Sequence, residues 1–384
     1  MGDGNISVAR AMPQSAEGSL ASPQVLKVIS LNNPALHPRQ LAYDKKRDGL
    51  WFWTSTQALG TRYSNHICYF DIRQRMLHSW PIDSHDWSSQ LFAGLAVAPN
   101  GDVWIGWNTN LLDFHPSTGS FVLYSLPTHP RYPLSSSVMG DLPANLGVAD
   151  IAVAVNGVVW IARYGALSLT TFSPSSRTFQ EYRLPSDSGD PAKLAIGPNS
   201  HIFFTTNLDA DRPGHGADTI GEFDPTTQST VIYQQGAQAL TVTPNGTLYT
   251  ASTGHGFGLS ELSSSEQAIA ASQHRPPQFQ QRIAPLDVDD SAIASDIHGR
   301  IWVAVAGRPD IAVFTPSSGE TRLYQYAAPS VAAFPSDGHM PGAMASTMEP
   351  GAVWIVAIVA MTTDSQGHLW YIRAGSDTLE EVDG

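Results

Sequence analysis

The sequence predicts an all-β protein made of seven copies of a four-stranded antiparallel unit. Three observations lead to this prediction. Residues 94–127 divide into four short strands joined by turn residues. A signature of a turn followed by an aromatic residue recurs seven times along the chain. A lone strand near the N-terminus matches the one strand that the last copy lacks, so the two chain ends can complete one unit together.

The unit at 94–127 shows how each strand is bounded. An apolar run at 95–98 is followed by the turn Pro-Asn-Gly at 99–101, where glycine can take a positive φ and the chain can reverse. The strands VWIGW and NLLDFH come next, and a second turn, Pro-Ser-Thr-Gly, lies at 116–119. The last strand, FVLYSLP, ends on a proline, which cannot continue a hydrogen-bonded ladder.

The repeats predict a closed ring. The recurring aromatic residues are Trp51, Trp104, Trp160, Phe203, Tyr249, Trp302 and Trp370. The seventh copy stops after its third strand, near 379–382, and residues 25–31 (VLKVISL) resemble the missing fourth strand. Pairing these ends leaves no sheet edge open. We therefore predict a seven-bladed β-propeller, four antiparallel strands per blade, as one domain over 24–384, with 1–23 as a flexible N-terminal tail.

The amino-acid composition limits the classes of molecule that the protein is expected to bind. The 21 basic and 34 acidic residues give a net charge of −13, which disfavours nucleic acids and anionic membrane surfaces. The single cysteine, Cys68, excludes an internal disulfide. The first residues lack the apolar core of a signal peptide, and no run of 18 apolar residues occurs, so we expect a cytoplasmic protein without a membrane span.

The repeat resembles that of virginiamycin B lyase (streptogramin lyase). The shared pattern is an apolar strand, Asn-Gly, Val-Trp-Ile, then Phe-x-Pro-x-Thr-Gly and Tyr-x-Leu-Pro, over about residues 24–384. The resemblance implies a seven-bladed propeller. It also implies a magnesium ion held by glutamates three positions after the blade aromatic, and a histidine base at the start of an innermost strand.

This sequence departs from that family at both sets of positions. Three residues after each aromatic stand Thr54, Trp107, Arg163, Thr206, Ser252, Val305 and Arg373. At the histidine positions stand Arg39, Ala93, Ala149, Ala192, Gln238, Ser291 and Val359. None of the first set is acidic and none of the second is histidine. The resemblance therefore predicts the fold, and we do not expect the family's elimination reaction, a magnesium ion or another cofactor.

These positions predict a ligand site of another kind. In a propeller they gather around one end of the central channel, the default ligand pocket. Arg163 and Arg373 are the candidate catalytic cations, and Trp107 offers a stacking face, which together suit a planar or anionic molecule. Further candidate substrate contacts are Thr54, Thr206, Ser252 and Arg39. Alternatively, the arginines pair with acids such as Asp150 and only close the channel.

Long insertions predict a lid over the same end. They lie at 55–65, 84–92, 128–148, 207–218, around 263–277 and at 327–353. Loops of such length are often functional, and these carry the candidate substrate contacts Tyr63 and Trp87. His215 and His255, each in a Gly-His-Gly loop, are candidate acid–base residues. The alternatives are that the loops cap the ring and that the histidines are structural. The 207–218 loop resembles a calcium loop, but Arg212 replaces the required glycine.

Three functions remain open at this point. The first is a small-molecule enzyme of specialised (secondary) metabolism, of lyase or cyclase type. It would close a ring without a metal, by a Diels–Alder-like cycloaddition of a bulky apolar substrate held in near-attack geometry. The second is a divergent metal-dependent lyase or lactonase that uses His215, His255 and nearby aspartates. The third is a non-catalytic propeller that binds a protein or a ligand.

Overall fold

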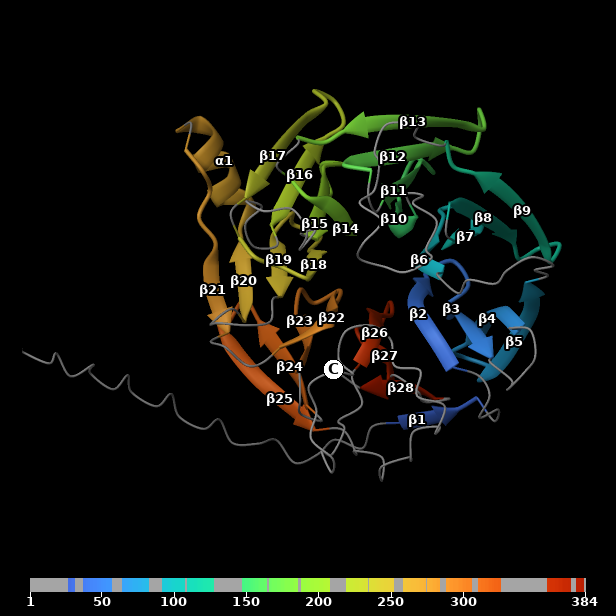
Figure 1. The fold of residues 1–384 in the computed structure, drawn as a ribbon. Coiled ribbons are helices and arrows are strands. Elements are labelled where there is room, and N and C mark those ends of the chain that lie inside the picture. Colours follow the sequence, from blue (N-terminus) through green and yellow to red (C-terminus); the bar gives the residue numbers. More distant parts are fainter. Residues whose placement is uncertain are drawn as a thin grey trace, which may run out of the picture.

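A computed structural model places seven four-stranded sheets in a ring (Figure 1). The structure describes residues 27–31, 37–56, 64–82, 92–107, 109–127, 147–163, 166–185, 188–207, 219–233, 235–251, 258–273, 275–283, 288–305, 310–325, 358–373 and 378–382. Six sheets have the strand order of an antiparallel meander, the seventh takes its outermost strand from the N-terminal part of the chain, and the blades follow one another in chain order. The predicted fold class is therefore confirmed.

The first four blades each consist of consecutive strands. Blade 1 contains β2 (His37–Asp44), β3 (Gly49–Thr56), β4 (Ser64–Asp71) and β5 (Met76–Ile82). Blade 2 contains β6 (Phe92–Val97), β7 (Val103–Trp107), β8 (Asn110–His115) and β9 (Ser120–Ser125). Blade 3 contains β10 (Val148–Val153), β11 (Val159–Arg163), β12 (Ser168–Ser173) and β13 (Thr178–Arg183). Blade 4 contains β14 (Asp190–Ile196), β15 (Ile202–Asn207), β16 (Ile220–Asp224) and β17 (Ser229–Tyr233).

The remaining three blades include the closure. Blade 5 contains β18 (Ala239–Val242), β19 (Leu248–Ala251), β20 (Leu259–Leu262) and β21 (Gln280–Ile283). Blade 6 contains β22 (Val288–Ser295), β23 (Ile301–Val305), β24 (Asp310–Thr315) and β25 (Glu320–Gln325). Blade 7 contains β26 (Ile358–Thr363), β27 (Leu369–Arg373), β28 (Thr378–Val382) and, as its outermost strand, β1 (Lys27–Ser30).

The ring closes as the sequence predicts. β1 pairs antiparallel with β28, from Lys27 opposite Glu381 to Ser30 opposite Thr378, and the two strands lie side by side in Figure 1. The innermost strands contact one another around the channel, and β26 of blade 7 contacts β2 of blade 1. The last blade therefore has four strands, like the other six, because β1 supplies the strand that pairs with β28. The predicted tail, 1–23, lies outside the described residues.

The signature turn has a geometric reason in every blade. The residue three before the blade aromatic has a positive φ in all seven copies, and five of the seven are glycine. The exceptions are Asp48, with φ 55°, and Ser200, with φ 66°. A positive φ costs an L-residue about 1–2 kcal/mol, which explains the preference for glycine here. The aromatic residues are all buried, between 0 and 5 % exposed, and pack between neighbouring blades.

An aspartate braces this turn in three blades. Asp44, Asp296 and Asp364 each accept a hydrogen bond from the indole N–H of the blade tryptophan, at 2.9–3.0 Å. Each carboxylate also accepts backbone N–H groups of the turn. A buried carboxylate with several donors is well compensated, so these aspartates fix the turn to the second strand.

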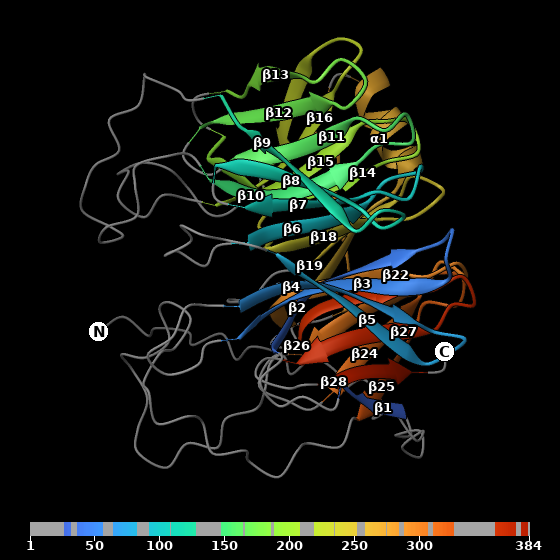
Figure 2. The same ribbon diagram turned by 90° about the vertical axis from the view of Figure 1, so that its right-hand side faces the viewer.

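One predicted lid segment lies elsewhere. The stretch around 263–277 contains the helix α1 (Ser264–Ser272), which connects the third and fourth strands of blade 5. A side chain on Gly246, in the turn between β18 and β19, would reach the Cβ atom of Ser264 at 3.6 Å. The helix therefore adjoins the signature turns, at the end of the ring opposite to the predicted pocket (Figure 2). The prediction for this segment is wrong because third-to-fourth connections share the end of the first-to-second turns.

Candidate functional site

The candidate site positions lie where the first strand of a blade begins and its second strand ends. Arg163 is opposite Val148, Trp107 is opposite Phe92, and Arg373 is opposite Ile358. The same register places Thr54 opposite Pro38 and Thr206 opposite Pro191. The described candidates therefore share one end of the ring, as predicted.

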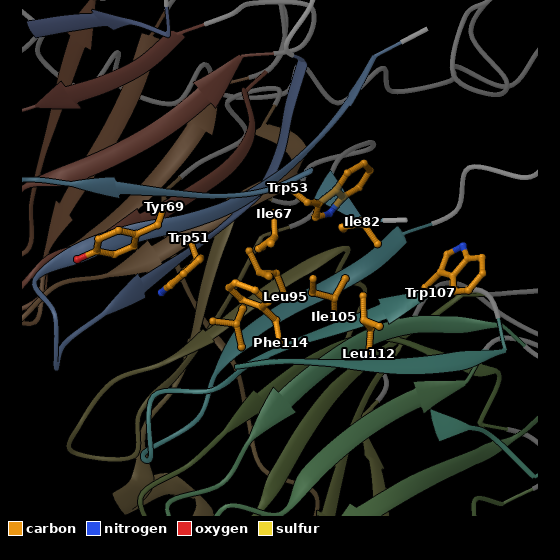
Figure 3. Close-up of a cluster of buried hydrophobic side chains, with 11 residues drawn as sticks. Trp51, Trp53, Ile67, Tyr69, Ile82, Leu95, Ile105, Trp107, Leu112 and Phe114 are labelled. Atoms are coloured by element: carbon orange, nitrogen blue, oxygen red, sulfur yellow. The ribbon is translucent and has the colours of Figure 1, made fainter. Parts of the chain in front are cut away.

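The strand pleat decides where these side chains point. Val159 and Ile161 belong to the core cluster between blades 2 and 3, and Arg163 follows them on the same face of β11. Likewise Val103, Ile105 and Trp107 face blade 1, and Figure 3 shows Trp107 at the far end of that cluster from Trp51 and Tyr69. Arg163 and Trp107 thus lie at one end of the rows of buried side chains that pack between neighbouring blades, which we call seams. A shared central pocket remains a prediction.

Arg163 is a buried cation with few partners. Its side chain is 1 % exposed, and Nη2 donates to the carbonyl oxygen of Pro127 at 3.0 Å. Within the described residues Nε and Nη1 have no hydrogen-bond partner. Burial lowers the pKa of Arg163, and the charge of Glu181 offsets part of that effect. Asp150 accepts a hydrogen bond from the backbone N–H of Leu194 and none of the described bonds joins it to Arg163.

Arg373 has the structural role that the alternative anticipates, with a different acid. Its Nε donates to Glu380 Oε1 at 2.5 Å, and Nη2 also contacts this carboxylate. Glu380 is 1 % exposed and accepts two further hydrogen bonds, from the hydroxyls of Tyr371 at 2.6 Å and Thr378 at 3.1 Å. This buried ion pair joins β27 to β28. Arg373 is therefore a weaker candidate for ligand binding than Arg163.

The other described candidates are less free to meet a ligand. Thr206 is fully buried and its hydroxyl lies 2.7 Å from that of Thr219. Thr54 is also fully buried and lies opposite His66 on β4, whose pKa is lowered by burial. Arg39, on β2, is half-buried, and burial lowers its pKa. Of these, Arg39 retains the exposure that a ligand contact needs.

Several predicted site residues lie outside the described residues. They are Tyr63, Trp87, His215, Ser252 and His255, together with the calcium-like stretch at 208–218. Their roles remain predictions.

The structure also brings together a group that sequence reasoning missed. Asp102, Asp113 and His115 of blade 2 lie near one another, with the His115 Nδ1 atom 3.0 Å from Asp102 Oδ1. Burial raises the pKa of Asp113 to about 7, and the hydrogen bond to Asp102 raises that of His115. In the sequence, the pattern that could have indicated this group is an acid two residues before Trp104 together with an acid on the next strand. Only the register Trp104 opposite Asp113 joins them.

Two pockets among the described residues lie away from the candidates. One, around Tyr43, Lys46 and Pro99, adjoins the signature turns near the channel. The other lies between blades 3 and 4, along Trp160, Tyr182 and Pro225. Neither is lined by a predicted site residue. Within the part of the chain that the structure describes, no helix has both the length and the apolar character needed to cross a membrane.

Comparisons with known proteins support the fold and assign no function to this chain. No protein-family profile matches the sequence, and no curated protein matches it. Among solved structures, a streptogramin B lyase is similar, with a TM-score of 0.63 and 16 % identity over 93 % of this chain and 97 % of that one. A catalytically inactive virginiamycin B lyase from Staphylococcus aureus with quinupristin gives 0.66 and 14 %, over 93 % and 98 %. YCF48 bound to the D1 peptide gives 0.59 and 12 %, over 96 % and 100 %. The chain is thus similar in fold to the virginiamycin B lyase propellers, as the sequence resemblance implies.

Proposed function

We propose that the end of the ring that holds Arg163 and Trp107 binds a planar, anionic or carbonyl-bearing small molecule. We further propose that the protein is an enzyme of specialised metabolism that closes a ring in this molecule without a metal. The observation that carries the proposal is the burial of Arg163 with two guanidinium nitrogens unpartnered among the described residues. The proposal includes a cytoplasmic location, which fractionation of the native cells tests.

The free-energy cost of burying the Arg163 guanidinium is an argument that a ligand binds to it. Taking a guanidinium out of water costs several kcal/mol unless hydrogen bonds and an opposite charge compensate. Arg373, at the equivalent position of blade 7, has that compensation in Glu380. Arg163 has one described hydrogen bond, to the carbonyl oxygen of Pro127, and the charge of Glu181 compensates part of the remaining cost. A ligand oxygen with negative charge, such as a carboxylate, phenolate or enolate, would accept the two remaining N–H groups as charge-assisted hydrogen bonds.

The surroundings favour an apolar or aromatic body for this ligand. Trp107 ends the seam on one side of blade 2, and Arg163 ends the seam on the other side. Trp53 belongs to the same cluster as Trp107 and is 5 % exposed. Indoles and a desolvated cation at the same end of the ring suit a planar molecule that carries one oxyanion or carbonyl oxygen.

Ring closure is the reaction that these groups support. No acidic residue occupies the positions that hold magnesium in the lyase family, and no histidine occupies the position of its base. A guanidinium that donates to a carbonyl oxygen withdraws electron density from a conjugated double bond and lowers the barrier to intramolecular addition. Positioning both ends of the substrate supplies up to about 7–11 kcal/mol. Such a cycloaddition conserves all atoms of the substrate and needs no proton transfer.

Native mass spectrometry tests the binding step. The purified protein is incubated with a metabolite extract of its source cells, and retained small molecules are identified after denaturation. We expect the native protein to retain an aromatic or conjugated acid or ketone, and we expect Arg163→Met to lose it. The matched control is Arg373→Lys, which preserves the cation of the Glu380 pair. Equal retention by Arg163→Met contradicts the proposed site.

Turnover of the retained molecule tests the reaction. Ring closure gives a product of unchanged mass with fewer conjugated double bonds, hence a weaker ultraviolet absorption. Hydrolysis adds the mass of one water, and elimination from a cyclic ester keeps the mass but adds a double bond. Retention without any of these changes identifies a non-catalytic binding propeller, and would refute the enzymatic part of the proposal alone.

A further inference from the structure

A cluster of three metal-ligating side chains lies in blade 2, at the signature-turn end of the ring. Asp102 follows the turn between β6 and β7, and Asp113 and His115 end β8. One ligand atom from each residue lies within 4.8 Å of the other two. The closest approaches are His115 Nδ1 to Asp102 Oδ1, at 3.0 Å, and His115 Nε2 to Asp113 Oδ2, at 3.5 Å.

The carboxylate of Asp113 is the unusual member of this cluster. Asp113 is 4 % exposed, and within the described residues its Oδ1 atom has no hydrogen-bond partner. Its other oxygen lies 3.5 Å from the His115 ring nitrogen, too far for a strong hydrogen bond. His115 therefore compensates only part of the desolvation cost of this buried carboxylate, and the Oδ1 atom has no described partner that would compensate the rest.

The other blades show what normally compensates an acid at this position. Asp113 lies opposite Trp104 in the register, as Glu222 lies opposite Phe203, Glu261 opposite Tyr249 and Glu381 opposite Trp370. Glu381 lies near two cationic side chains, His368 at 3.6 Å and Arg75 at 4.0 Å. Glu222 and Glu261 have closer partners within the protein.

In blade 4, Glu222 accepts hydrogen bonds from Tyr233 and pairs with His201. In blade 5, Glu261 accepts from the Tyr249 hydroxyl at 2.9 Å and pairs with Arg282 at 2.7 Å. Among the described residues, Asp113 accepts no hydrogen bond from a tyrosine hydroxyl or an arginine, and its side chain is one methylene shorter than that of glutamate. Its partner should therefore come from solution.

We propose that Asp102, Asp113 and His115 bind a divalent transition-metal ion of the zinc type. One imidazole nitrogen with two carboxylate oxygens is a ligand set that suits zinc, whereas calcium and magnesium prefer oxygen ligands throughout and more of them. The side chains of Asp102 and His115 are 21 % and 32 % exposed, which leaves room for entry and for a water ligand. The Asn100 side-chain amide donates to Asp102 Oδ2 at 2.7 Å and orients this carboxylate.

The site is independent of the proposed function. Asp102 precedes β7, whereas Trp107 ends that strand, so the cluster and the candidate ligand site lie at opposite ends of blade 2. A bound ion would join the turn between β6 and β7 to the end of β8. Its role is therefore structural, and its loss would be visible in stability and metal content.

Zinc and cobalt titrations test the proposal on the full chain. Protein freed of metal by a chelator is titrated with ZnCl₂ in a calorimeter and with CoCl₂ in a spectrophotometer, where cobalt bound to nitrogen and oxygen ligands absorbs in the visible range. We expect Asp113→Asn and His115→Gln each to weaken the site by about tenfold or more. The matched control is His201→Gln, at the similar His–Glu–Asp group of blade 4, and should leave this site unchanged.

Each result decides the proposal. Equal zinc affinity and cobalt spectra for the native protein and both blade 2 variants would overturn it, as would tighter binding of magnesium or calcium than of zinc. Absence of any zinc-dependent signal in the native protein would also overturn it. Asp113→Asn removes a buried charge without changing shape, so it should fold, and without metal we expect it to melt at or above the temperature of the native protein. Melting well below it would show that the Asp113 charge is compensated inside the protein.

Discussion

Replacing two arginines at equivalent positions should have opposite effects on stability. Arg163→Met removes a cation that is 1 % exposed and has one described hydrogen bond, to the Pro127 carbonyl oxygen. The lost hydrogen bond costs about 1.5–3 kcal/mol, and the relieved desolvation of the charge is worth several kcal/mol. We therefore expect a change between about zero and 3 kcal/mol in favour of the folded state.

Arg373→Met should destabilise the protein. It leaves the Glu380 carboxylate, which is 1 % exposed, without its cation, and breaking a buried pair in this way costs about 3–5 kcal/mol. The two variants remove the same groups from the same strand position, so their difference reports the partners alone. We expect it to be at least about 3 kcal/mol.

Urea unfolding followed by tryptophan fluorescence measures this difference. The chain contains 10 tryptophans, most of them in strands, so the signal reports the ring. Equal dependence on urea in both variants is required for the midpoints to be compared. If Arg163→Met destabilises as much as Arg373→Met, Arg163 holds the fold together, and the reasoning that reserves it for a ligand is refuted.

Three further predictions concern the scaffold. Ser200→Gly should stabilise by about 0.5–1 kcal/mol, because Ser200 holds φ 66° where five blades have glycine; a lower urea midpoint would contradict this. Cys68 is fully buried and burial raises its thiol pKa from 9.0 to about 11, so Ellman's reagent at pH 8 should react at least about a hundredfold faster in urea than with the native protein. Asp296→Ala should cost about 3–5 kcal/mol in urea unfolding, because it leaves the Trp302 indole and Arg300 without their carboxylate; Glu320→Ala, in an exposed pair, should change nothing measurable.

The ring can be predicted well from the sequence because the same pattern of turns and strands occurs in seven copies. A turn that needs a positive φ three residues before an aromatic is visible even though two copies have Asp48 and Ser200 in place of glycine. The closure strand is visible because an incomplete last unit leaves a strand to be found elsewhere. Both inferences rest on local chemistry and on the need to pair sheet edges.

The sites are harder to predict because they depend on what side chains meet across blades and strands. Arg163 and Arg373 occupy the same position of the repeat in the sequence. They differ in the structure because Arg373 pairs with Glu380 on the next strand, whereas Arg163 donates to the Pro127 carbonyl oxygen. The helix at Ser264–Ser272 was misplaced because an insertion's length does not tell which end of the ring it leaves from. The Asp102 and Asp113 pair needs the strand register to be seen at all.

A repeated scaffold offers an internal standard for function. The charged residues at equivalent positions are Arg373 for Arg163, and Glu222, Glu261 and Glu381 for Asp113. They show how the fold compensates a charge at that position, so a charge with fewer partners can be recognised. Arg163 and Asp113 are such charges, of opposite sign and at opposite ends of the ring. If each is kept for its own ligand, the double variant Arg163→Met with Asp113→Asn should change the unfolding free energy by the sum of the single changes, within about 0.3–0.5 kcal/mol. A coupling larger than this, measured by urea unfolding without metal, would mean that the two charges stabilise each other through blade 2. Neither would then be an independent ligand site.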